Sequence, residues 1–131
     1  MSKINLVNDD AIGVFRFLNT VDMPPKATRA KVKLLKALNA VGKDIMADQK
    51  AIADEFGGTI TEDGRIVYDT PEHREAANTN IRILSMESRD IEEDYNGQFK
   101  VLKEFFDDYD KTIPSEFADS YIILVDELEQ V

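Results

Sequence analysis

Residues 71–109 read PEHREAANTNIRILSMESRDIEEDYNGQFKVLKEFFDDY, and one largely apolar stripe runs through this stretch. The stripe recurs at alternating spacings of four and three residues, which is the pattern of a long helix with one buried face. Thr70 followed by Pro71 is typical of a helix cap and first helical position. We therefore expect one helix over residues 71–109, either continuous or kinked at Asn96-Gly97. The stripe consists of Ala77, Ile81, Leu84, Ser88, Ile91, Tyr95, Gln98, Leu102, Phe105 and Tyr109.

A second long helix is predicted over residues 28–56, upstream of the first. Thr28 is a suitable cap, and Gly57-Gly58 ends the helix because glycine tolerates the left-handed C-terminal conformation. Its apolar stripe also recurs at three and four residues. The stripe consists of Leu34, Leu38, Val41, Ile45, Ile52 and Phe56.

A β-hairpin is predicted over residues 59–68, between the two long helices. β-branched residues flank Asp63-Gly64, a dipeptide that supplies the positive φ angles of a tight turn. A two-residue turn would pair Glu62 with Arg65 and Thr61 with Ile66.

Shorter elements are predicted at both ends of the chain. Residues 1–22 contain a short extended lead at 3–8, which could be a strand, and a helix capped by Asn8 or Asp9. Met23-Pro24-Pro25 ends that helix, since proline cannot donate a helical hydrogen bond. The last helix covers residues 115–130, with Phe117, Tyr121, Leu124 and Leu128 on its buried face.

Together these elements predict a mainly α fold in one domain, residues 1–131. The long helices form an antiparallel hairpin that carries the β-hairpin at its tip, and the first and last helices pack around the other end. Aromatic residues concentrate at that other end. A single chain has few ways to bury the apolar stripes of both long helices, so we also consider a homodimer. The aromatic group comprises Phe99, Phe105, Phe106, Tyr109, Phe117 and Tyr121.

The net charge of −10 is placed unevenly along the chain. Residues 1–86 carry 12 basic and 12 acidic side chains, whereas residues 87–131 carry 4 basic and 14 acidic ones. This balance argues against direct nucleic-acid binding, which needs the opposite sign. It indicates either a solvated face or a docking face for a basic protein, including one that itself binds nucleic acid. No apolar run reaches the length of a signal peptide or membrane span, so we expect a cytoplasmic or virion-associated protein without a membrane partner.

No catalytic, cofactor or metal motif is recognisable. The chain has no cysteine and one histidine, His73, without a second metal ligand or a nucleophile in a recognisable setting. Residues from Asp108 onward begin like a calcium loop, but Ile113 occupies the position that requires glycine. We therefore expect no enzyme activity, no cofactor and no metal.

The order of landmarks resembles a small family of uncharacterised proteins from phages and prophages of Gram-positive bacteria. The similarity lies in the Ile4-Asn5-Leu6-Val7-Asn8 lead, the Lys26–Lys31 cap before a leucine-rich helix, the Glu62-Asp63-Gly64 turn and the acidic end from Phe117 to Glu129. The resemblance implies a phage origin and a cytoplasmic or virion setting. It implies no catalytic residues.

These observations predict a non-catalytic phage accessory protein that binds another protein through an acidic helical face. Two narrower alternatives are an anti-defence inhibitor that occupies the nucleic-acid groove of a host nuclease, and a structural or assembly factor of the virion tail. The predicted partner-binding residues are the acids Glu92, Glu93, Asp107, Asp108 and Asp110 and the hairpin tip Glu62, Asp63, Gly64 and Arg65.

Overall fold

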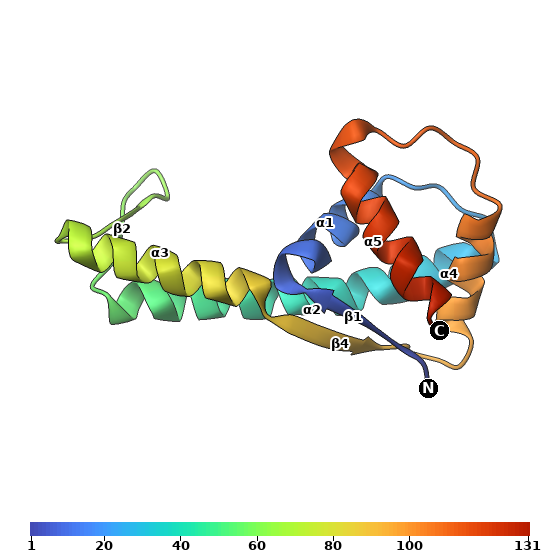
Figure 1. The fold of residues 1–131 in the computed structure, drawn as a ribbon, viewed down its shortest axis with the longest axis horizontal. Coiled ribbons are helices and arrows are strands. Elements are labelled where there is room, and N and C mark those ends of the chain that lie inside the picture. Colours follow the sequence, from blue (N-terminus) through green and yellow to red (C-terminus); the bar gives the residue numbers. More distant parts are fainter.

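Helix α2, Pro25–Glu55, is the longest element and runs through most of the length of the molecule (Figure 1). The computed structural model describes all residues 1–131 and shows a mainly α fold. Before α2 come β1 (Lys3–Val7) and α1 (Asn8–Asn19). After it come β2 (Thr59–Ile60), β3 (Ile66–Val67), α3 (Pro71–Met86), β4 (Ser88–Glu92), α4 (Gln98–Asp107), the 3₁₀ helix η1 (Ser115–Phe117) and α5 (Ala118–Glu129).

The molecule divides into a body and an arm (Figure 1). The arm, residues 43–86, is the second half of α2 with α3 antiparallel to it, and the β2–β3 hairpin lies at its tip. The body, residues 1–42 and 87–131, holds the remaining elements around the first half of α2. The predicted helical hairpin and its β-hairpin tip are thus confirmed.

The single helix predicted over residues 71–109 is wrong. α3 ends at Met86, residues 88–92 form strand β4, and α4 starts only at Gln98. Glu87 adopts an extended conformation, and Gly97, at φ 93°, provides the left-handed residue from which α4 begins. Ile91, which belongs to the predicted helical stripe, is still buried, because it is the residue of β4 that faces the core.

The break exists because β4 pairs with the N-terminal strand. β1 and β4 are antiparallel, with Ile4 opposite Ile91 and Val7 opposite Ser88. Ile4 and Leu6 alternate with exposed residues and point into the core, as a half-buried strand requires. The predicted strand at the N-terminus is confirmed, and its partner is the segment assigned to the long helix.

The β-hairpin has a different register from the predicted one. Ile60 faces Ile66 and Thr59 faces Val67, so the strands pair one residue out of the expected register. The Thr61 N–H donates to the Arg65 carbonyl at 2.8 Å, which closes a three-residue loop that contains Gly64 at φ 84°.

Of the predicted N-terminal helix caps, only Thr70 is confirmed, whereas at the C-terminal end of α2 Gly57 adopts the expected left-handed conformation at φ 73°. The Thr70 side-chain oxygen accepts a hydrogen bond from the His73 N–H at 3.1 Å. Helix α2 begins earlier than predicted, at Pro25, and the Thr28 hydroxyl instead donates to the Met23 carbonyl. Helix α1 begins at Asn8, whose side chain is buried and bonded elsewhere.

The main hydrophobic cluster lies in the body. It is a cluster of 16 buried residues from β1, α1, the first half of α2, β4, α4 and α5, with the α1–α2 turn residue Val21. The predicted aromatic concentration lies against it: Phe17 has its ring centroid 6.0 Å from those of Phe106 and Phe117 and 5.9 Å from that of Tyr121.

Candidate partner-binding site

Two of the predicted acids, Asp108 and Asp110, line a surface hollow of about 480 Å³ at the body end of α2. The hollow lies where the turn before α2 approaches the end of α4. Asp22 supplies a third exposed carboxylate, while Phe105 and Tyr109 are half-buried. The remaining lining residues are Met23, Pro24 and Lys111.

Local structure fixes this hollow on both sides. Pro24 precedes Pro25 at the start of α2, which restrains the backbone on one side. On the other side, α4 ends at Asp107, and the Tyr109 N–H donates to the Phe106 carbonyl at 3.2 Å. The Tyr109 ring packs 5.6 Å from Phe105 and 5.5 Å from Phe106, centroid to centroid. The aromatic wall is therefore anchored to the core.

The carboxylates of the hollow are not neutralised within the chain. Asp22, Asp108 and Asp110 take part in no ion pair within 4.0 Å, and Lys111 also has no such partner. Asp107 and Asp108 lie at the C-terminal end of α4, where the helix dipole adds partial negative charge. The acids do not gather into a group that could hold a metal ion.

Carboxylates beside half-buried aromatic rings suit a lysine or arginine side chain. A cation gains from the ring quadrupole and from charge-assisted hydrogen bonds to the acids. The chain itself contains one such contact, because the guanidinium of Arg29 lies 4.0 Å from the ring centroid of Tyr95. The hollow thus has the chemistry to accept a basic side chain of another protein.

Glu93 does not belong to an exposed acidic face, which corrects the prediction. It is 4% exposed, and its carboxylate accepts hydrogen bonds from the Ser2 N–H at 3.0 Å and the Phe99 N–H at 3.2 Å. Burial raises the pKa of Glu93, but the backbone N–H groups of Ser2, Phe99 and Gly97 and the N-terminal ammonium outweigh it and leave the pKa below its ordinary value. Glu93 therefore fixes the N-terminus to the start of α4.

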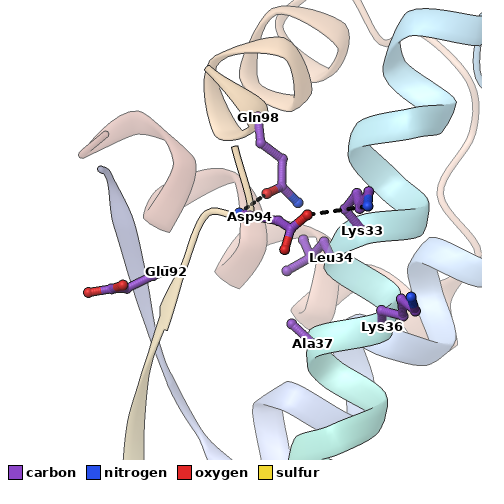
Figure 2. A pocket seen from close by; sticks show the side chains of 7 residues that line it. All are labelled: Lys33, Leu34, Lys36, Ala37, Glu92, Asp94 and Gln98. Carbon is purple, nitrogen blue, oxygen red and sulfur yellow. Dashed lines mark hydrogen bonds and ion pairs between the residues drawn. The ribbon is translucent and has the colours of Figure 1, made fainter. Parts of the chain in front are cut away.

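Glu92 is exposed on β4 and lies at a second hollow, of about 340 Å³ (Figure 2). Its side chain points away from Asp94. Asp94 instead pairs with Lys33 at 3.3 Å, and its N–H donates to the Gln98 side-chain oxygen. Gln98 in turn donates to the Ala30 carbonyl at 3.0 Å. The Lys33–Asp94 ion pair spans this hollow, so these charged groups are already paired within the chain. The hollow is therefore a weaker candidate for partner binding than the first one.

The predicted residues of the hairpin tip lie at the far end of the arm, away from the acids (Figure 1). Glu62, Asp63, Gly64 and Arg65 are all exposed. The Arg65 Nε donates to Asp63 at 2.8 Å, and a hydrogen bond from Thr61 holds the pKa of Asp63 below its usual range. The exposed residues of the predicted set therefore lie on three separate surfaces: the hollow with Asp108 and Asp110, the hollow with Glu92, and the hairpin tip.

Sequence reasoning missed a polar joint between arm and body. The buried Asn8 side chain donates to the Leu84 carbonyl at 2.8 Å and accepts from Arg89 Nε at 2.7 Å. Arg89 also pairs with Asp44 at 3.3 Å and Asp48 at 3.8 Å on α2. This network ties the end of α3 to α1, α2 and β4.

Comparisons with known proteins place this chain in no group. No protein-family model, curated protein or solved structure matches it. None of its helices combines the length and the apolar character needed to cross a membrane. The function is therefore inferred from the surfaces described above.

Proposed function

We propose that this chain is a non-catalytic phage accessory protein that acts by binding another protein, and that the hollow beside Asp108 receives a basic side chain of that partner. The phage setting comes from the sequence resemblance alone. The binding role is supported by one observation above the others: three unpaired carboxylates surround an aromatic wall that is anchored to the core. The carboxylates disfavour an anion, and the aromatic wall favours a cation that can approach Tyr109.

Electrostatic attraction would increase the rate of association with such a partner. Residues 87–131 carry the whole net charge of −10, so a basic protein is attracted before contact. Such attraction is screened by salt, and the association rate should fall steeply as ionic strength rises. A basic nucleic-acid-binding host protein has the right charge, which supports the anti-defence inhibitor as the narrower function.

The test is a pull-down from host lysate with the tagged chain at low and at high salt, followed by binding measurements on any purified protein that is retained. We expect a basic protein that is lost at high salt and competed away by DNA or RNA. Changing Asp108 and Asp110 together to Asn should weaken binding about tenfold or more, because each lost charge-assisted hydrogen bond is worth about 1.5–3 kcal/mol.

A matched control is the double change Glu72→Gln and Glu75→Gln on the arm. It removes the same charge from two exposed acids that lie away from the hollow. If the arm and hollow variants weaken binding equally, the overall charge and not the hollow is responsible. Co-purification with virion particles, with no basic partner retained, would replace the inhibitor with the tail-assembly alternative.

A further inference from the structure

Two exposed helix stripes in this chain have the same spacing and opposite charge. On α2, Lys43, Met46 and Lys50 follow one another at intervals of three and four residues. On α5, Asp119, Ile122 and Asp126 do the same. Residues at these intervals share one helix face. Each stripe is therefore an apolar side chain between two like charges, lysines on one helix and aspartates on the other.

Neither stripe is satisfied within the chain. Met46 is 69% exposed and Ile122 is 53% exposed. None of the four charged side chains takes part in an ion pair within 4.0 Å. Helix α5 packs against α1, α4 and β1, so the two stripes do not meet in one molecule.

The α2 stripe borders an apolar hollow of about 250 Å³ between α1 and α2. Gly42 leaves space in this hollow, because apart from its chain neighbours and the backbone of its own helix no atom lies within 4 Å of where its Cβ would be. Lys43 and Met46 are among the lining residues, and the hollow is large enough for one aliphatic side chain. The apolar lining residues are Ile12, Phe15, Leu38, Ile45 and Met46.

We propose that this groove binds helix α5 of a second copy of the chain. Ile122 of one copy enters the hollow beside Met46 of the other, and Asp119 and Asp126 pair with Lys43 and Lys50. With the helices parallel, the three pairs align without any shift in register. If both copies bind in this way about a twofold axis, both grooves and both α5 stripes are covered.

The surroundings of Asp119 support this arrangement. The pKa of Asp10 is raised, mainly by burial and then by the nearby negative charges of Asp9 and Asp119. Asp119 therefore lies close to Asp10. The start of α1 and the start of α5 thus form a negative spot with no cation of the same chain to neutralise it. A lysine from a second copy would supply that cation.

The first experiment is sedimentation velocity over a concentration series of the purified full chain. We expect a reversible monomer–dimer equilibrium. Met46→Ser and Ile122→Ser should each weaken it about tenfold or more, since each removes most of one buried apolar side chain. Ile83→Ser is the matched control, because Ile83 is 57% exposed on α3 outside the groove and its loss should leave the equilibrium unchanged. A wild-type chain that stays monomeric up to millimolar concentration overturns the proposal.

A charge exchange tests the pairing itself. One variant carries Lys43→Glu with Lys50→Glu, and the other carries Asp119→Lys with Asp126→Lys. Each alone should be monomeric, because like charges then face one another, whereas an equimolar mixture should form dimers through restored opposite pairs. Circular dichroism establishes that both variants fold. Dimers of either variant alone, or a mixture that stays monomeric, would show that another surface is used.

Discussion

The body and the arm are built from the same kind of amphipathic helix but are stabilised very differently. Of the 24 buried residues only four, Ile45, Ala53, Ala77 and Leu84, lie in the arm, and none of the 16 core-cluster residues does. Six of the ten exposed large hydrophobic residues, by contrast, lie on the arm: Met46, Ile60, Ile66, Val67, Ile83 and Met86. A third of the chain thus depends on a narrow helix–helix seam and on its connection to the body, which makes the arm the region of lower local stability.

The largest expected effect is the loss of unfolding free energy when a side chain of the body core is truncated, compared with a truncation on the arm. Phe17 is buried among Phe106, Phe117 and Tyr121, and Phe17→Ala should lower the free energy of unfolding by about 3–5 kcal/mol. Ile83→Ala on the arm should change it by less than about 0.5 kcal/mol, because that side chain is already exposed. Urea unfolding followed by circular dichroism measures both. Equal losses would contradict this expectation, because an exposed side chain of the arm would then contribute as much as a side chain buried in the core.

A smaller effect is expected at the joint. Asn8→Ala removes one of the donors to the Leu84 carbonyl and the acceptor of Arg89 Nε, and should cost about 1–3 kcal/mol. Hydrogen exchange should then accelerate in the last turn of α3 and in β4 more than in α5. Asn80→Ala is the control, because the exposed Asn80 side chain bonds only to its own helix at Ala76. Unchanged exchange in α3 would mean that the arm holds its position without Asn8.

The smallest effect concerns pH and the body alone. The folded state holds the pKa of Glu93 below its ordinary value, so this carboxylate contributes stability above about pH 4.5 that is lost as pH falls through the lowered pKa. Glu93→Gln should cost about 1–2 kcal/mol at pH 7 and little in strong acid, because the charge-assisted hydrogen bonds from Ser2 and Phe99 weaken. Urea unfolding at a series of pH values measures this. The exposed Glu92→Gln should follow the wild-type curve; a pH-independent loss in Glu93→Gln would contradict the electrostatic role.

The sequence predicted the parts of this fold that depend on nearby residues. Thr70-Pro71, Gly57-Gly58 and Asp63-Gly64 act within a few residues of themselves, and the helix ends and the hairpin lie where they indicate. The strand β4 could not be found in this way. Ile91 satisfies both the helical period from Leu84 and the alternation of a strand, and the choice is made by β1, which lies about 85 residues away in the chain. A signal was nevertheless present, since a strand at residues 3–8 requires a partner.

The candidate site was predicted only in part, for a similar reason. Asp108 and Asp110 were expected from charge density along the chain, but Asp22 joins them through tertiary structure. Glu93 was wrongly placed on the exposed acidic face. A run of acidic residues in the sequence does not show which carboxylate is buried and accepts hydrogen bonds from backbone N–H groups. The hairpin tip is exposed, but it lies apart from the acids with which it was grouped.

Helix α2 gives this separation a fixed length. It starts directly after the hollow, at Pro25, and ends two residues before the glycine pair that leads to the hairpin. At about 1.5 Å per residue its 31 residues span roughly 46 Å. A single rigid ligand that contacts both ends of α2 must therefore span about this distance. A shorter ligand can contact only one of the two ends.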